Sequence, residues 1–194
     1  RFGEDLMSRV SYGFMNKGGA DELTKAVQDG LQQLIETAAI KIDLDVQDIF
    51  EIVLVGNPVM HHLVLGIDPV ELGGAPFALT FDTAFNCAAH EIGLSLNVAT
   101  RVYVLPCIAG HVGADAAGAV LAEAPHNSEA MTLLIDVGTN AEIILGNRHH
   151  LMAASSPTGP AFEGAQISAG QRAAVGAIER VRINPNSYEP RFKV

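Results

Sequence analysis

Asp136, Gly138 and Thr139 are the residues whose types and spacing could do chemistry. They lie in the segment Met131 to Asn147, which has an apolar run, a glycine bend and a second apolar run. This pattern predicts two strands joined by a tight turn. Consecutive amides in such a turn can cradle an anion, and a carboxylate at a strand end can hold Mg²⁺. The segment predicts a phosphate and metal site with Asp136 as the metal ligand, although Asp-x-Gly-Thr is also a common hairpin turn.

A second carboxylate, Glu163, is expected near this turn. Leu151 to Ser156 predicts a third strand, and Pro157 to Pro160 predicts a turn into a helix that begins near Glu163. That turn lies one strand from Asp136, so both carboxylates could face one metal-phosphate group. A glutamate in the first turn of a helix is also favoured by the helix dipole alone.

Another candidate turn follows the apolar run Phe50 to Val55. We expect this run to be a strand buried on both faces, as in a sheet covered by helices. Asn57 is a good N-cap and Pro58 a good first helical residue, so Gly56 and Asn57 should turn the strand into a helix. Such turns can bring amides to a ligand, but most only change the chain's direction.

The segment Cys107 to Asp115 leads from a strand over Arg101 to Leu105 into an alanine-rich helix through Glu123. Its small residues permit close packing, which is the structural interpretation of the motif. Asp115 in the first turn could serve chemistry or only the helix dipole.

The remaining elements frame these turns. A helix with Asp21 as its cap should bury one apolar face, which comprises Leu23, Val27, Leu31, Leu34, Ile35 and Ala38. Thr83 to Ile92 predicts a helix, and Ala177 to Ile183 and Tyr188 to Val194 predict a closing pair of strands. Neighbouring histidines on a helix point about 100° apart, so His61 and His62 should pack or form hydrogen bonds rather than share a metal.

Composition limits the function classes. The 194 residues are 48% hydrophobic and carry a formal net charge of −10, which argues against nucleic acid or a membrane surface as a main partner. Two cysteines, Cys87 and Cys107, cannot supply the ligands of an iron–sulfur cluster. The absence of a disulfide framework and of a long apolar stretch predicts a cytoplasmic protein.

Four motifs in order, VGNPVMHHLVLGIDP, LPCIAGHVGAD, LLIDVGTNAEIILGN and SSPTGPAFEGAQISAGQRAAVGAIERV, resemble the C-terminal ATPase region of the ATP-dependent reductive activators of corrinoid proteins. These activators belong to the acetate and sugar kinase, Hsp70 and actin (ASKHA) superfamily. The resemblance implies an α/β fold of two ribonuclease H-like lobes of the actin and Hsp70 type, with ATP and Mg²⁺ between them. Residues 1–127 would be part of the first lobe with an insertion, and residues 128–194 would start the second lobe.

By this resemblance the residues that contact nucleotide fall in both lobes. Asp136, Glu163 and Asp115 would be the catalytic carboxylates. The nucleotide-binding positions would be Gly138, Thr139, Asn140, Gly159, Gly164, Gly113, Gly56 and Asn57. The implied activity is ATP-driven return of an inactive Co(II) corrinoid to methyl-accepting Co(I). The implied partners are a corrinoid protein or corrinoid-dependent methyltransferase and an electron donor.

The sequence also departs from a complete activator. We expect the [2Fe-2S] domain and the first Asp-x-Gly-Thr loop upstream of Arg1, and a glycine-pair adenosine motif beyond Val194. An internal fragment cut inside each lobe should bind ATP weakly and hydrolyse it negligibly, and its open sheet edges could pair in a homodimer. Two alternatives stay open: a small-molecule kinase of the same superfamily, with Asp115 as base, and a non-enzymatic module that docks a corrinoid protein.

Overall fold

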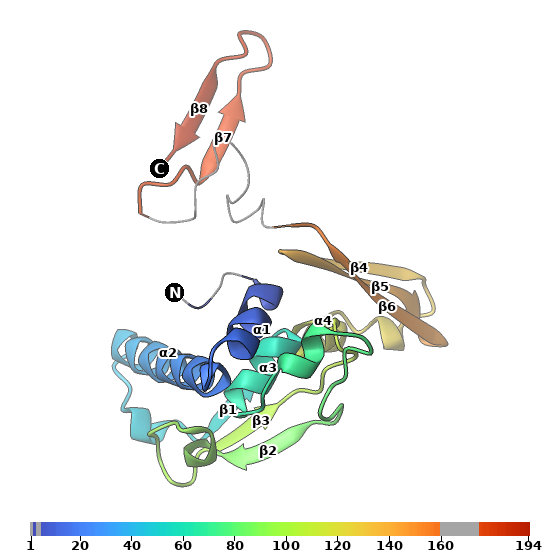
Figure 1. The fold of residues 1–194 in the computed structure, drawn as a ribbon. Helices are drawn as coiled ribbons and strands as arrows, with labels where there is room; N and C mark the ends of the chain where they lie inside the picture. Colours follow the sequence, from blue (N-terminus) through green and yellow to red (C-terminus); the bar gives the residue numbers. More distant parts are fainter. Residues whose placement is uncertain (1, 3–4, 160–174) are drawn as a thin grey trace. The chain divides into compact units, whose positions relative to one another are not determined.

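The computed structural model describes residues 2, 5–159 and 175–194, and these form two compact units (Figure 1). The first unit comprises Arg1–Ile135 and Glu142–Ser155, and the second comprises Asp136–Ala141 and Ser156–Val194. In the part of the chain that the structure describes, no helix combines the length and apolar character needed to cross a bilayer.

Helices and short strands follow one another as far as η4, and the elements described after η4 are all strands. In order they are α1 (Leu6–Met15), α2 (Gly19–Lys41), η1 (Val46–Asp48), β1 (Glu51–Leu54), α3 (Pro58–Val64), η2 (Val70–Gly73), β2 (Phe85–Ala88), η3 (Ala89–Ile92), β3 (Arg101–Val104), α4 (Ala114–Glu123), η4 (Pro125–Asn127), β4 (Thr132–Val137), β5 (Asn140–Asn147), β6 (His150–Pro157), β7 (Arg180–Ile183) and β8 (Pro190–Lys193).

Local capping sets where the first helices begin. The Asp5 carboxylate accepts a hydrogen bond from the Ser8 amide at 2.7 Å and closes a capping box at the start of α1. Gly18 has a φ of +78°, which interrupts the helical conformation between α1 and α2, and it is the N-cap of α2. The predicted cap at Asp21 is wrong, because the helix starts earlier and Asp21 lies in its first turn.

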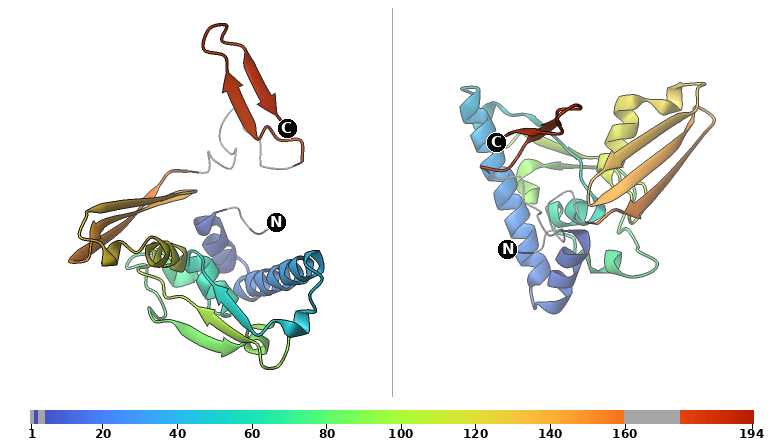
Figure 2. Two further views of the ribbon diagram at one scale, coloured as in Figure 1. Left: turned by 180° about the vertical axis from the view of Figure 1, so that it is seen from behind. Right: turned by 90° about the horizontal axis from the view of Figure 1, so that it is seen from above.

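The first sheet has the strand order β1-β3-β2, with β1 parallel and β2 antiparallel to β3. Helices α1, α2 and α3 lie over one face of this sheet (Figures 1 and 2). Val27, Leu31 and Ile35 of α2 pack against the core cluster that contains Val102 and Val104 of β3. The apolar face predicted for α2 is therefore correct at these positions.

Three details of the predicted core are wrong. Leu34 of α2 is 67% exposed and Ala38 is exposed, because the helix contacts the sheet along a narrower stripe than its apolar residues suggest. Strand β1 is not buried on both faces, since Val53 is 57% exposed. The segment Thr83 to Ile92 is not one helix: it contains β2 followed by the 3-10 helix η3, because pairing with β3 overrides its local helical pattern.

The second sheet has the order β4-β5-β6 and is covered by α4. Ala116 of α4 packs with Ile144 of β5 in a buried cluster, against which Leu134 and Leu151 also pack. The alanines of α4 permit this close approach.

Strands β7 and β8 form an antiparallel hairpin, as the sequence predicts. The register pairs Arg180 with Lys193, Val181 with Phe192, and Arg182 with Arg191. Every residue of both strands is exposed.

Candidate phosphate-binding turn

The turn between β4 and β5 is the site that the sequence places at the centre of the chemistry. Asp136 lies near the end of β4, Gly138 and Thr139 form the bend, and Asn140 begins β5. The Gly138 amide donates to the Asn140 carbonyl at 2.8 Å. The predicted strand, turn and strand are therefore present, and the Gly138 amide is engaged within the turn.

Thr158, at the exit of β6, fastens this turn. Its hydroxyl lies 2.5 Å from the Gly138 carbonyl and 2.9 Å from the Thr139 carbonyl. The amides of Thr158 and Gly159 both donate to the Thr139 carbonyl, at 3.1 Å and 3.0 Å. The structure thus brings Gly159 to the turn of Gly138 and Thr139. The sequence predicted this proximity but missed the fastening role of the Thr158 hydroxyl; a threonine beside a glycine after a strand was the available signal.

The Asp136 side chain is exposed beside this fastened turn. Among the described residues, no three histidines, cysteines, aspartates or glutamates gather as a metal cage. Magnesium in nucleotide sites uses one or two carboxylates together with phosphate oxygens and water, so a single exposed carboxylate next to a turn fits that chemistry. Glu163 and Gly164, the other predicted contributors from this part of the chain, lie outside the described residues.

The first unit brings a separate group of predicted site residues together. The Gly56 carbonyl accepts from the amides of Ala114 and Asp115, at 2.9 Å and 3.3 Å, so the first amides of α4 are capped by the turn after β1. Gly113 lies in this contact, and a Cβ there would come within 2.6 Å of the Gly56 oxygen. The glycines at 56 and 113 therefore have a packing explanation besides the predicted nucleotide contact.

Asn57 and Asp115 complete this group. The Asn57 side chain accepts from the Met60 amide at 2.9 Å and caps α3, and Pro58 is its first residue, as predicted. An Asp115 carboxylate oxygen accepts from the Ala116 amide at 2.9 Å. Both side chains thus accept hydrogen bonds from amides in the first turn of a helix, α3 for Asn57 and α4 for Asp115.

His61 and His62 of α3 are buried, with 3% and 1% of their surface exposed. The Nδ1 atom of His62 lies 2.8 Å from the Pro58 carbonyl, and its Nε2 accepts from the Thr80 amide at 3.3 Å. These two bonds satisfy a neutral ring, and burial lowers the pKa of His62. The predicted packing and hydrogen-bonding role is correct for His62.

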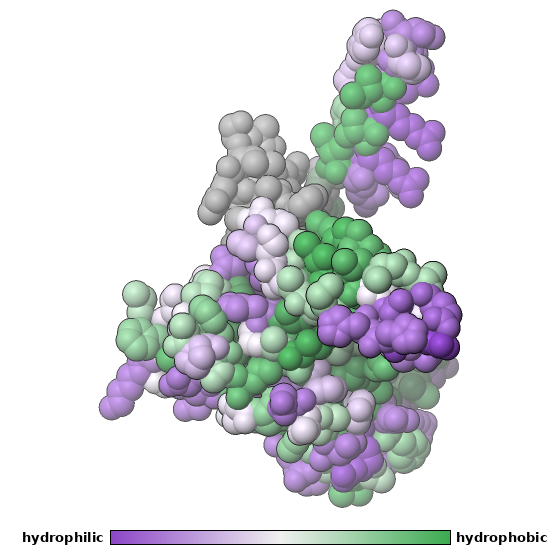
Figure 3. Space-filling view, turned by 90° about the vertical axis from the view of Figure 1, so that its right-hand side faces the viewer, coloured by the Kyte–Doolittle hydropathy of each residue, from purple (hydrophilic) through white to green (hydrophobic). Residues whose placement is uncertain are grey.

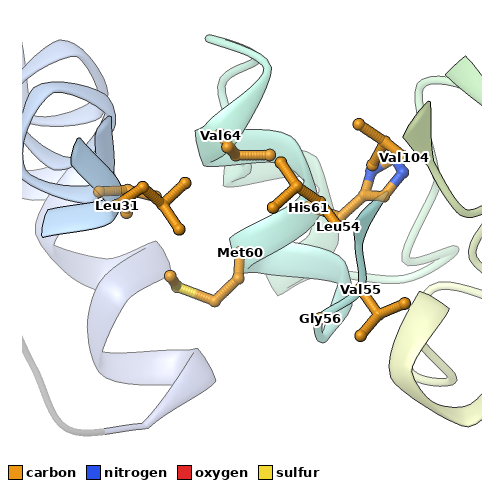
Figure 4. A pocket seen from close by; sticks show the side chains of 9 residues that line it. Leu31, Leu54, Val55, Gly56, Met60, His61, Val64 and Val104 are labelled. Carbon is orange, nitrogen blue, oxygen red and sulfur yellow. The ribbon is translucent and has the colours of Figure 1, made fainter. Parts of the chain in front are cut away.

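His61 differs, because neither of its ring nitrogens has a hydrogen-bond partner among the described residues. It lines an apolar pocket of about 80 Å³ with side chains from α2, β1, α3 and β3, including Leu31, Leu54 and Val104 (Figure 4). Burial and then the neighbouring His62 lower the pKa of His61. The sequence did not indicate this pocket.

The two cysteines are buried free thiols. Burial raises the pKa of Cys87, and burial raises the pKa of Cys107 to about 11. Both are therefore protonated near neutral pH, which is the form of a packing residue rather than of a nucleophile or metal ligand.

Comparison with known proteins divides the chain into two matched parts. Residues 1–128 match a family model described as the RACo middle region, and residues 130–194 match the model of the C-terminal domain of RACo, the ASKHA domain. The chain is 37% identical over 180 residues to the corrinoid activation enzyme RamQ of Eubacterium limosum, which covers 93% of this chain and 30% of that protein. It is 28% identical over 193 residues to the Co(II) methylated amine-specific corrinoid protein reductase of Methanosarcina barkeri, which covers 90% of this chain and 36% of that protein.

A solved structure is similar over the same length. The reductive activator for corrinoid, iron-sulfur protein matches with a TM-score of 0.88 and 36% identity, over 99% of this chain and 31% of that one. The chain therefore spans about a third of the length of these proteins. The predicted ribonuclease H-like fold agrees with three observations: the mixed α/β architecture with small sheets, the match to the ASKHA domain and the structural similarity to the reductive activator.

Proposed function

Because the chain belongs to the RACo family, we propose that it carries ATP-binding elements of a reductive activator that helps return a Co(II) corrinoid protein to Co(I). The names of its relatives support this proposal, since each describes activation or reduction of a corrinoid protein. In this proposal residues 1–127 belong to a first lobe and residues 128–194 open a second lobe.

The observation that carries the proposal is the turn fastened by Thr158. This turn lies within residues 130–194, which match the ASKHA domain. It follows the Asp136 carboxylate at the end of β4, and the Thr158 hydroxyl contacts the carbonyls of both residues of the bend. A turn held in one conformation keeps its neighbouring groups in place before a ligand arrives, which reduces the entropy cost of binding.

In this proposal Asp136 would hold Mg²⁺, directly or through its waters, and the residues of the turn would contact phosphate. The bound ion would supply positive charge beside the phosphate oxygens. Thr158 would act as a positioning residue, because its hydroxyl contacts the turn rather than the ligand. Phosphoryl transfer depends on several such parts acting together, so we expect the chain alone to bind ATP weakly and to hydrolyse it negligibly.

The proposal is tested with the segment placed within a full-length activator. Phosphate release and the absorption spectrum of the corrinoid are followed with ATP, Mg²⁺, an electron donor and a Co(II) corrinoid protein. We expect ATP-dependent formation of Co(I), and we expect Asp136→Asn to reduce it strongly while Asp82→Asn, an exposed control, leaves it unchanged.

Other outcomes would point to other functions. Phosphate transfer to a small acceptor without corrinoid reduction would favour a kinase. Binding of the corrinoid protein without any nucleotide effect would favour a docking module. Fast ATP turnover by the 194-residue chain alone would contradict the expected dependence on further segments.

A further inference from the structure

A buried histidine without hydrogen bonds lines an apolar pocket in the first unit. His61 is 3% exposed, and neither of its ring nitrogens has a hydrogen-bond partner among the described residues. Its ring contacts those of His62 and Phe81, with centroids 5.7 Å and 5.4 Å away. Buried polar groups in native proteins are nearly always hydrogen-bonded, so these two nitrogens indicate that a further group belongs in the pocket.

The pocket has apolar walls and one polar end. Its walls come from α2, β1, α3 and β3, all within the first unit, and its volume is about 80 Å³ (Figure 4). Val55, just after β1, lines it and is 54% exposed, so the pocket runs from the buried imidazole toward the surface. Hydrophobic side chains reach the surface elsewhere too, as the green areas of Figure 3 show, but in this pocket they surround a polar group that can select a ligand.

The ligand that suits this pocket is neutral. Burial lowers the pKa of His61, so its ring is uncharged near neutral pH and offers one N–H donor and one acceptor nitrogen. A charged ligand would lose its hydration among aliphatic side chains without gaining a counter-charge. A hydroxyl group can donate to one ring nitrogen or accept from the other, so it pairs with either tautomer.

Water alone satisfies this pocket poorly. A buried water typically makes about three hydrogen bonds, and among the lining side chains only His61 carries a nitrogen or oxygen. The carbonyls of Leu54 and Gly56 already accept hydrogen bonds, from Leu105 at 3.1 Å and from Ala114 at 2.9 Å. An aliphatic chain with one hydroxyl would fill the apolar volume and also pair with the imidazole.

We propose that this pocket, which we call the His61 pocket, binds a small aliphatic alcohol with its hydroxyl on the imidazole and its carbon chain directed toward Val55. The pocket has about half the volume of a cavity of about 150 Å³ that holds benzene, so about three or four carbon atoms fit inside it. Segments beyond this chain can cover the end near Val55, but the first unit already encloses the imidazole. The site is separate from the Gly138 turn and does not depend on the proposed ATP function.

The test follows the methyl groups of Leu31 and Val64 by NMR while ethanol, 1-propanol and 1-butanol are added to the full chain. We expect saturable shifts and an affinity that rises about fourfold with each added methylene, the usual gain from burying such a group. The charged analogue n-butylammonium should bind at least about tenfold more weakly. The ¹⁵N signals of the His61 ring should shift with 1-butanol, because the hydroxyl contacts a ring nitrogen.

Two variants separate the imidazole from the apolar walls. His61→Leu removes both ring nitrogens, and His90→Leu makes the same change at an exposed position of η3. We expect the first variant to bind 1-butanol about fivefold more weakly, because one hydrogen bond is lost, and the second to bind it as the wild type does. Far-ultraviolet circular dichroism confirms that each variant is folded. If His61→Leu does not fold, the alcohol series and the ring signals of the wild type still decide.

Three results would overturn the site: no saturable shifts in the wild type, equal affinities across the alcohol series, or equal binding by the wild type and His61→Leu. The titration is then repeated with a full-length activator that carries this segment. Binding there supports the site. Binding by the chain but not by the full-length protein would show that another segment fills the pocket, and would also overturn the site. The titrations measure neither ATP nor Co(I), so the proposed function stands or fails separately.

Discussion

The Thr158 hydroxyl lies 2.5 Å from the Gly138 carbonyl and 2.9 Å from the Thr139 carbonyl, so one side chain holds both residues of the bend. Thr158→Val removes the hydroxyl and keeps the shape of the side chain, whereas Thr158→Ser keeps the hydroxyl. We expect the valine variant to speed amide hydrogen exchange at Gly138 and Gly159 about threefold, because an exposed hydrogen bond contributes about 0.5–1.5 kcal/mol. Exchange rates measured by NMR that do not differ between the two variants would remove Thr158 from this role.

Asp136 should confer Mg²⁺ dependence on nucleotide binding. In a full-length activator carrying this segment, Asp136→Asn removes a negative charge from the exposed end of β4 without changing the shape of the side chain. We expect Mg²⁺ to raise the affinity of the wild type for ATP by about 10-fold or more. The variant should lose most of this increase. Calorimetric titrations with and without Mg²⁺ measure the difference. A variant that keeps the full Mg²⁺ effect would show that another group holds the metal.

Gly113 should be intolerant of a side chain. A Cβ at this position would lie 2.6 Å from the Gly56 oxygen and 2.7 Å from the Asn57 Cα, and both are backbone atoms. We expect Gly113→Ala to lower the free energy of unfolding by about 1–3 kcal/mol, the usual cost of overpacking. Urea unfolding followed by circular dichroism measures this.

Gly118, inside the helix α4 that follows Gly113, is the control glycine. A Cβ there would lie 3.4 Å from Val55 Cγ1, which is ordinary van der Waals contact. Gly118→Ala should raise the free energy of unfolding by up to about 1 kcal/mol, because alanine favours the helix. Equal effects of the two alanines would contradict the close contact between Gly56 and Gly113.

The pH dependence of stability should reflect His61 and His62. Both pKa values are lowered from the ordinary value of 6.5, so below pH 6.5 the unfolded chain binds more protons than the folded chain. Above pH 6.5 both rings are mostly neutral in the folded and in the unfolded chain, so their burial does not oppose folding. As the pH falls below 6.5 toward the folded-state pKa values, the unfolded chain gains protons first, and the free energy of unfolding should fall. Urea unfolding between pH 7.5 and about 5.5 tests this sign.

The two histidines should respond differently to leucine. His61 has no hydrogen-bond partner among the described residues, so His61→Leu should flatten the pH dependence with little loss of stability at pH 7.5. His62→Leu would leave the Thr80 amide without its acceptor, and we expect it to cost about 1–3 kcal/mol at the same pH. A large loss for His61→Leu and none for His62→Leu would reverse the assignment.

Much of what is decided locally could be predicted from the sequence, although the cap of α2 at Gly18 was missed. Asn57 and Pro58 form the start of α3 because capping depends on neighbouring residues, and the bend at Gly138 follows from the glycine between two apolar runs. It failed where distant pairing decides. Residues 83–92 have a helical pattern, but Cys87 pairs with Val102 of β3, and this contact lies outside any local window.

The candidate site shows the same division. The proximity of Gly159 to Thr139 followed from counting strands, whereas the hydroxyl bonds of Thr158 depend on atomic positions that no spacing specifies. The family resemblance predicts Gly56 and Gly113 as nucleotide contacts, and the structure adds a packing reason for both. The proposed contacts of these residues with nucleotide remain predictions.

Strand β4 leaves Leu133, Ile135 and Val137 between 49% and 58% exposed, at alternate positions along one side of the strand. Apolar association near room temperature is driven by entropy and weakens on cooling. If copies of this chain join through that side, chilling a sample should disperse them and rewarming should bring them back together. Sedimentation at two temperatures would therefore distinguish this contact from one made by charges.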